Sequence, residues 1–272
     1  MATSKFPSSF LPALPELRTA SFFGRNIRYY DVGSGPPLVL IHGIGGDADE
    51  WVFCFKSLGA SHRVIALDLL GFGRSDKPAI EYCIAVFVEV LEHFLSALKI
   101  PRASLVGSSL GGWIAAAFAL QFPDRVDKLV LVDAAGVWDG PTNLPIDLHV
   151  STFAHMRHVM ERVLHDKSLA TDELVELSYR QHLERGDGYT IDRVLKNLRD
   201  GHERLDDTIG QLSMPVLLIW GEQDEMIPLG NGRLMQRLIP GSRLDVIPQC
   251  GHLPAFEKPI EFTNCVLNFL GQ

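Results

Sequence analysis

Short apolar runs alternate with longer amphipathic stretches along most of the chain. Each run holds four or five residues rich in valine, leucine and isoleucine, without the regular apolar–polar alternation of a strand that has one face in water. Near-continuous runs of this kind indicate strands buried on both faces of a parallel sheet. The six runs cover residues 38–41, 64–67, 103–106, 128–132, 216–220 and, more weakly, 243–247.

The stretches between these runs carry helical patterns, most clearly at residues 82–98, 110–121 and 259–270. The last of them opens with Pro259, which suits a first helical turn because that turn leaves its N–H groups without intrahelical partners. Before the first run, two short apolar segments flank Gly24-Arg25-Asn26 and predict a β-hairpin. The alternation as a whole predicts an α/β fold, in which helices flank a mostly parallel sheet.

One interval breaks this alternation, because no strand-like run occurs between Val132 and Val216. Apolar residues at three- and four-residue spacing predict helices there instead, and Thr171 with Asp172 can cap one of them. The spaced residues are Phe153, Met156, Met160 and Val163, and further on Ile191, Val194, Leu195 and Leu198. We therefore expect residues 137–205 to form a helical lid inserted after the sixth strand. Residues 1–136 and 206–272 are then expected to form the core domain.

The apolar run at 103–106 leads into GSSLG (residues 107–111), which reads G-x-S-x-G between a strand and a helix. This pattern is typical of a nucleophile elbow, a turn so sharp that a Cβ two residues before or after the serine would collide with its neighbours. The central serine sits on a strained backbone, and the N-terminus of the following helix favours negative charge beside it. Ser109 is therefore the candidate nucleophile, whereas Ser108 lies one residue from the tip.

A serine hydroxyl is a weak nucleophile unless a base accepts its proton and a carboxylate orients that base. After an elbow of this type, the expected chain order is serine, acid, histidine. Asp224 follows the strand at 216–220, and His252 alone among the ten histidines lies between the last strand and the last helix. The alternative acids are Asp133, at another strand end, and Glu222 and Glu225, which flank Asp224. We favour Asp224 because G-x-x-D-x-x-x-P after a strand is the common acid loop.

Acyl transfer also needs N–H donors for the negatively charged oxygen of its transition state. We expect one donor to be the backbone N–H of Leu110, directly after the nucleophile. The second is expected to be the backbone N–H of Ile44, in the glycine-rich loop HGIGG (residues 42–46) that follows the first core strand. We interpret His42, at the start of this loop, as a structural residue that holds the loop by hydrogen bonds.

Composition limits the partners and the cellular context. A formal charge of −8 argues against a nucleic-acid partner and against an anionic membrane surface. No run of apolar residues is long enough to predict a transmembrane helix, and prolines interrupt the amino-terminal segment where a signal peptide would be continuous. Four widely spaced cysteines argue against a disulfide framework or a zinc site. We expect a cytoplasmic protein with no metal and no membrane insertion, while no motif bears on its oligomeric state.

Taken together, these motifs resemble the α/β-hydrolase superfamily over nearly the whole chain. The matching segments are HGIGG (42–46), LDLLGFGRSDKP (67–78), GSSLGG (107–112), FPDRVDKLVLVD (122–133), GEQDEMIP (221–228) and GHLPAFEKP (251–259). The resemblance implies a sheet of about eight strands, a helical lid between the sixth and seventh strands, and hydrolysis without a cofactor. Haloalkane dehalogenases and epoxide hydrolases have an aspartate nucleophile at the position of Ser109, so those branches are set aside.

The leading hypothesis is a carboxylesterase that acts on short to medium acyl esters. Ser109 would attack the ester carbonyl, His252 would carry the proton to the leaving alcohol, and Asp224 would orient the imidazole. Water would then release the acid from the acyl-enzyme. A small-molecule ester is the partner that this hypothesis requires.

A second hypothesis keeps the triad but replaces the ester with a ring-fission product whose carbon–carbon bond is hydrolysed. Enzymes of that kind often have G-N-S-M-G-G at the elbow and a tryptophan after the catalytic histidine, whereas this chain has GSSLGG and Leu253. The hypothesis predicts an arginine in the lid that binds the substrate carboxylate. The candidates are Arg157, Arg162, Arg180, Arg185 and Arg193.

A third hypothesis belongs to another class, a small-molecule receptor that retains the triad and signals through closure of the lid. A single covalent event without turnover would indicate such a receptor.

Overall fold

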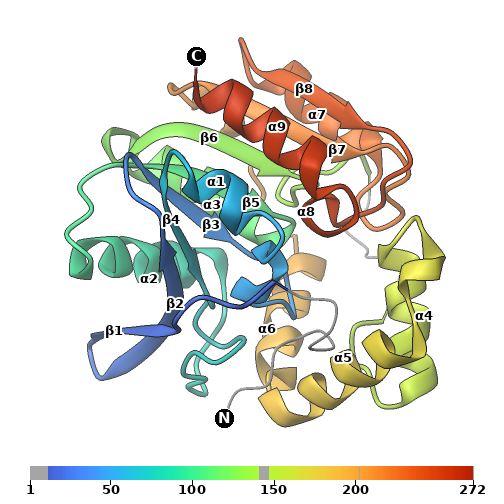
Figure 1. Ribbon diagram of the computed structural model, residues 1–272. Helices are drawn as coiled ribbons and strands as arrows, with labels where there is room; N and C mark the ends of the chain where they lie inside the picture. Colours follow the sequence, from blue (N-terminus) through green and yellow to red (C-terminus); the bar gives the residue numbers. More distant parts are fainter. Residues whose placement is uncertain (1–11, 141–146, 202, 272) are drawn as a thin grey trace.

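The computed structural model describes residues 12–140, 147–201 and 203–271. Its centre is an eight-stranded sheet in the order β1-β2-β4-β3-β5-β6-β7-β8 (Figure 1). The pairs β1–β2 and β2–β4 are antiparallel, and every other neighbouring pair is parallel. The strands are β1 (Arg18–Phe22), β2 (Arg25–Val32), β3 (Pro37–Ile41), β4 (Arg63–Leu67), β5 (Ala103–Ser108), β6 (Val126–Val132), β7 (Val216–Gly221) and β8 (Arg243–Ile247). The predicted fold class is thus confirmed.

Helices cover both faces of this sheet, which explains why its strands read as continuous apolar runs. Val39 and Ile41 of β3 belong to the hydrophobic cluster that contains α2 and α3, whereas Leu38 and Leu40 belong to the cluster that contains α1 and α9. The helices outside the predicted lid are α1 (Phe55–Gly59), α2 (Ile84–Ala97), α3 (Leu110–Gln121), α7 (Leu229–Leu238), α8 (Pro254–Glu257) and α9 (Pro259–Leu270). Short 3-10 turns include η1 (Ala48–Trp51).

Between β6 and β7 the described residues include three α-helices, at one side of the molecule (Figure 1). They are α4 (Phe153–Val163), α5 (Asp172–Arg185) and α6 (Gly188–Arg199). The Thr171 hydroxyl accepts the backbone N–H of Leu174, so the expected cap at the start of α5 is present. Ile191 and Val194 of α6 are buried in the large cluster beside α2 and α3. That these helices act as a lid with boundaries at residues 137 and 205 stays a prediction.

Parallel strands present their carboxyl ends at one edge of the sheet, and the loops that leave this edge carry all the candidate catalytic residues. The loops follow β3, β5, β6, β7 and β8, and they contain Ile44, Ser109, Asp133, Asp224 and His252 in that order. No helix within the described ranges has both the length and the apolar character needed to cross a bilayer. The cytoplasmic location stays a prediction.

Candidate active site

Ser109 occupies the sharp turn between β5 and α3, with φ +53° and ψ −115°. This region of backbone space is costly for a residue with a Cβ, so surrounding bonds must hold it. The Ser109 N–H donates to Val132 O at 2.9 Å, and its carbonyl accepts N–H groups from α3 and from the loop after β6. A Cβ at Gly107 would lie 2.2 Å from Gly111 O, and one at Gly111 would lie 2.2 Å from Ile41 O. The two glycines of the motif are therefore sterically required.

His252 lies in the loop after β8, and its ring meets the carboxyl group of Asp224. The distance from His252 Nδ1 to Asp224 Oδ2 is 2.7 Å. Asp224 Oδ1 accepts the backbone N–H groups of Met226 and Ile227 at 2.7 and 3.0 Å, which fixes the carboxyl plane. Burial lowers the pKa of His252, but the charge of Asp224 and the hydrogen bond to it outweigh burial and hold this pKa above its ordinary value.

Ser109 and His252 line the same cavity, of about 210 Å³. Within the described residues their side chains make no direct hydrogen bond, and such contacts often tighten only when substrate binds. Asp224 is thus the carboxyl group that contacts the imidazole, as the acid loop predicts. The catalytic roles of Ser109, His252 and Asp224 stay predictions until they are tested by substitution.

The alternative acid, Asp133, lies beside the pair without contacting the imidazole by a hydrogen bond. Its Oδ1 accepts the N–H of Gly221 at 2.9 Å, and its Oδ2 is buried without a partner among the described residues. Burial and the neighbouring charge of Asp224 raise the pKa of Asp133 well above its ordinary value, which favours a neutral acid. Within the ranges described, Asp133, Asp224 and His252 form the one group with metal-ligand spacing, their ligand atoms lying within 4.8 Å of one another.

The glycine-rich loop after β3 packs directly against the elbow, since a Cβ on Gly43 would lie 3.2 Å from Ser109 Cβ. His42 anchors the loop: its Nε2 accepts the Leu69 N–H at 2.9 Å, and its Nδ1 lies 2.7 Å from Gly43 O. Burial lowers the pKa of His42, which keeps the ring neutral and matches its predicted structural role.

Two backbone N–H groups were expected to form the oxyanion hole. Ile44 lines the cavity beside Ser109. Leu110 is the first residue of α3, a position whose N–H has no intrahelical partner. Ile44 thus borders the cavity and Leu110 directly follows Ser109 in the chain, and their oxyanion role stays a prediction.

Only one of the five candidate arginines lines the cavity together with Ser109 and His252, and it is Arg185 at the end of α5. The other four have acidic neighbours elsewhere: Arg157 with Asp172, Arg162 with Glu225, Arg180 with Glu176 and Arg193 with Glu81. The sequence offered no signal to choose among them, because all five lie on helices of similar composition.

The Arg185 guanidinium is largely buried and held close to the glycine-rich loop. It pairs with Asp47 and donates to Gln181 Oε1 at 3.2 Å and to Gly45 O at 3.5 Å. His182, one turn earlier on α5, lines the same cavity. An arginine in this position offers a planar, permanently charged group suited to a carboxylate.

The comparison with protein families gives one match that spans most of the chain. The model of the alpha/beta hydrolase fold family matches residues 36–200 and 198–259.

Individual relatives cover nearly the full length. A 2-hydroxymuconate semialdehyde hydrolase of Pseudomonas sp. (strain CF600) is 35% identical over 260 residues, covering 92% of this chain and 92% of that one. A 2-hydroxy-6-oxo-2,4-heptadienoate hydrolase of Pseudomonas putida is 33% identical over 266 residues, covering 91% and 93%. A solved meta-cleavage product hydrolase of Pseudomonas fluorescens IP01 superposes with a TM-score of 0.86 at 30% identity, covering 93% and 97%.

These relatives overturn one prediction from the sequence, that the protein is a carboxylesterase. They are hydrolases of meta-cleavage products and related semialdehydes, not of carboxylic esters. The prediction was wrong because the elbow, the histidine–acid pair and the glycine-rich loop serve any reaction that begins with attack on a carbonyl carbon. The motif that often accompanies carbon–carbon hydrolysis is altered in this chain, which has GSSLGG and Leu253, so it gave no signal for that reaction.

Proposed function

The chain belongs to the α/β-hydrolase fold family, and within it we propose that the protein hydrolyses the carbon–carbon bond of a ring-fission product, a 2-hydroxy-6-oxo-2,4-dienoate. The observation that carries this proposal is Arg185, a buried cation in the cavity that also contains Ser109 and His252. Arg185 already pairs with Asp47, and the carboxylate of a dienoate can add a second anionic partner to its guanidinium, whereas a simple ester has no such group. The named activities of the relatives agree with this choice.

The chemistry requires an electron sink, because breaking a carbon–carbon bond leaves an electron pair on carbon. Moving the proton of the 2-hydroxyl group to C5 gives a 2-oxo tautomer that can take up this pair through its conjugated system. Ser109 Oγ then attacks the C6 carbonyl while His252 accepts its proton, and we assign stabilisation of the oxyanion to the N–H groups of Ile44 and Leu110.

The C5–C6 bond breaks next, and the electron pair moves into the conjugated 2-oxo system as the proton on His252 returns to the departing fragment. The C6 acyl group remains on Ser109. Water attacks this acyl-enzyme with His252 as base and releases a carboxylic acid. The triad therefore does the same work as in ester hydrolysis, and the dienoate replaces the alcohol as leaving group.

The chain departs from the common pattern of carbon–carbon hydrolases at Ser108, Leu110 and Leu253, and the two of these that line the cavity, Ser108 and Leu253, are compatible with this chemistry. Ser108 takes the place of the asparagine in G-N-S-M-G-G. It lines the cavity, and its Oγ is buried without a partner among the described residues. A buried hydroxyl in this state is available to bind a polar substrate atom. Leu253, in place of the tryptophan, contributes an apolar surface instead of an indole N–H.

A pair of substrates that form the same acyl-enzyme tests the proposal. 2-Hydroxy-6-oxo-2,4-heptadienoate and para-nitrophenyl acetate both leave an acetyl group on Ser109, so their rates differ only in binding and in the first step. We expect kcat/KM for the dienoate to exceed that for the ester at least a hundredfold. No turnover of the dienoate, or a faster ester reaction, would contradict the proposal.

The role of Arg185 is tested in the same assay. Arg185→Gln is expected to raise KM for the dienoate about 10- to 100-fold, the loss of one charged hydrogen bond of roughly 1.5–3 kcal/mol. Hydrolysis of para-nitrophenyl acetate should change little, which also reports on folding. Arg180→Gln, exposed on the same helix, is the matched control. An equal effect of both substitutions on the dienoate would reject this role.

A further inference from the structure

The cavity has a second end, away from Arg185, and we propose that it selects ring-fission products whose C6 substituent is an uncharged alkyl or aryl group. Substrates with a second carboxylate on this substituent would be rejected. This inference rests on the proposed function, because only a dienoate placed between Arg185 and Ser109 sends its C6 substituent into this end.

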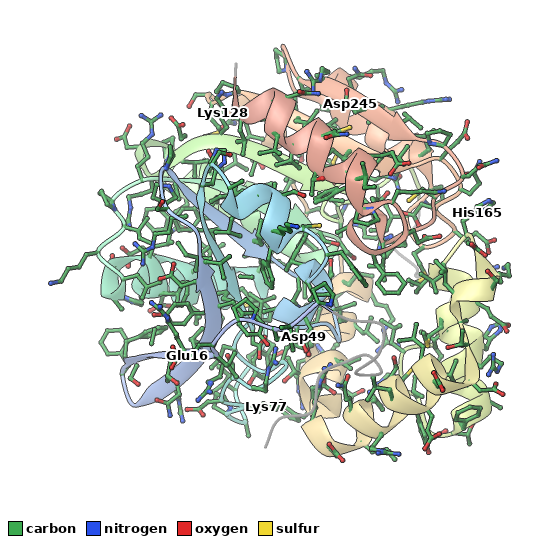
Figure 2. All side chains as sticks on the ribbon, viewed as in Figure 1. Glu16, Asp49, Lys77, Lys128, His165 and Asp245 are labelled. Carbon is green, nitrogen blue, oxygen red and sulfur yellow. The ribbon has the colours of Figure 1, made fainter. Side chains whose placement is uncertain are left out.

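The two ends of the cavity are built by different helices. α5 brings Arg185 to the glycine-rich loop, where it contacts Gly45 O. α4 instead joins the histidine loop, since the His252 N–H donates to Val163 O at 2.8 Å. Figure 2 shows His165 just beyond α4, where the His165 N–H donates to Glu257 of α8 at 2.9 Å. A substrate held by Arg185 and attacked by Ser109 therefore extends its other half toward α4 and α8.

The side chains that face the cavity from α4 and α8 are apolar. They form one contiguous hydrophobic cluster in which each contacts others of the set. The lining members of this cluster include Val150, Met156, Val159, Met160, Leu253 and Phe256. Methionine side chains are unbranched and adapt to ligands of different shape, so a wall of this composition suits both alkyl and aryl groups.

Apart from the catalytic candidate His252, whose ring is held by Asp224, no basic side chain lines this end among the described residues. The ionisable side chains that line the cavity are Glu50, His182, Arg185 and His252. His182 and Arg185 belong to the α5 end, and Glu50 Oε2 lies 3.4 Å from the N–H of Gly43 in the glycine-rich loop. A second carboxylate would thus lose its hydration to an apolar wall without a charged partner, which is strongly unfavourable.

The arginines of α4 do not alter this conclusion. Arg157 bonds to Ala170 O and pairs with Asp172, and Arg162 pairs with Glu225 at 2.6 Å. Neither lines the cavity. Selection against a second carboxylate therefore has two causes. The carboxylate finds no charged partner at this end, and burial of an uncharged hydrocarbon group against the apolar wall is favourable.

A substrate series with a constant dienoate half tests the inference. The C6 substituents are methyl, phenyl, 2-carboxyethyl and 3-methylbutyl, the last being an uncharged group of the same shape as carboxyethyl. We expect the methyl, phenyl and 3-methylbutyl compounds to be turned over with kcat/KM within about tenfold of one another. The carboxyethyl compound should fall at least a hundredfold below the 3-methylbutyl compound, mainly through KM.

A pair of variants tests whether the wall itself is responsible. Val159→Arg places a cation in the apolar lining and should raise kcat/KM for the carboxyethyl compound at least tenfold while lowering it for the phenyl compound. His158→Arg adds an arginine one residue away on the exposed face of α4 and should change neither.

The outcomes separate the inference from the function on which it rests. If none of the four compounds is hydrolysed, the proposed function fails. If they are hydrolysed but the carboxyethyl and 3-methylbutyl compounds react equally well, the proposed function stands and the selection is refuted. Equal gains in Val159→Arg and His158→Arg would refute the assignment to the wall.

Discussion

Two buried aspartates lie beside His252, and replacing each by asparagine separates their roles. In Asp224→Asn, the amide oxygen can still accept the N–H groups of Met226 and Ile227, so the NH₂ group turns toward His252 Nδ1. That nitrogen must then accept, which moves the imidazole proton to Nε2 and removes the base that faces Ser109. The same tautomer error in a Ser-His-Asp triad costs about 10⁴-fold in kcat, and we expect a loss of this order.

Asp133→Asn should behave differently, because burial and the charge of Asp224 raise the pKa of Asp133 and already favour its neutral form. The asparagine oxygen keeps the hydrogen bond from Gly221, and its NH₂ group occupies the place of the unpartnered Oδ2. The expected change in kcat is less than about tenfold, equivalent to roughly 1.4 kcal/mol.

Stopped-flow absorbance of 2-hydroxy-6-oxo-2,4-heptadienoate measures both variants, and circular dichroism confirms that each is folded. The reasoning would be refuted if Asp133→Asn lost as much activity as Asp224→Asn. It would also be refuted if Asp224→Asn stayed within tenfold of the unsubstituted protein.

Three further predictions concern pH and stability. The pKa of His252 is raised and the base must be neutral, so kcat/KM should fall as pH decreases through a value above about 6.5; an unshifted or lower midpoint would contradict this. Folding raises the pKa of Asp133, so the stabilising contribution of this residue is lost as pH rises above about 3.9. In urea unfolding from pH 4 to pH 8, the free energy of unfolding of Asp133→Asn should therefore increase relative to that of the unsubstituted protein. A difference in unfolding free energy that stays constant with pH would contradict this prediction. Gly111→Ala should lower stability by about 3 kcal/mol or more in thermal unfolding, whereas Gly188→Ala, with open space around it, should not; equal effects would contradict the steric argument.

Much of the fold could be predicted from apolar runs, because strands covered by helices on both faces leave an unmistakable pattern. β3 at residues 37–41 and β7 at 216–221 were predicted to within a residue. α7 was not predicted, since LGNGRLMQRL (residues 229–238) contains two glycines that weaken a helical pattern. Its helical form depends on packing, with Gly232 so close to Trp220 that a Cβ would lie 2.7 Å from the indole.

Some residues of the candidate site could also be predicted from the sequence, and others could not. Ser109 and His252 could be located because a strained turn and a fixed chain order impose a local pattern. Arg185 could not be selected, because its place in the cavity depends on how α5 packs against the glycine-rich loop. The carbon–carbon alternative came second because GSSLGG and Leu253 depart from the usual motif of such enzymes, and this is why the sequence alone led to the wrong activity.

The most direct test of the proposed function is rapid mixing of Ser109→Ala with 2-hydroxy-6-oxo-2,4-heptadienoate. We predict that this variant still binds the dienoate, seen as a saturable shift of the substrate's absorbance, and cleaves it at least a thousandfold more slowly than the unsubstituted protein. The unsubstituted protein should form acetate and the dienoate fragment in equal amounts. Cleavage by Ser109→Ala within tenfold of the unsubstituted rate, or an unsubstituted protein that releases no acetate, would contradict a serine-dependent carbon–carbon hydrolase.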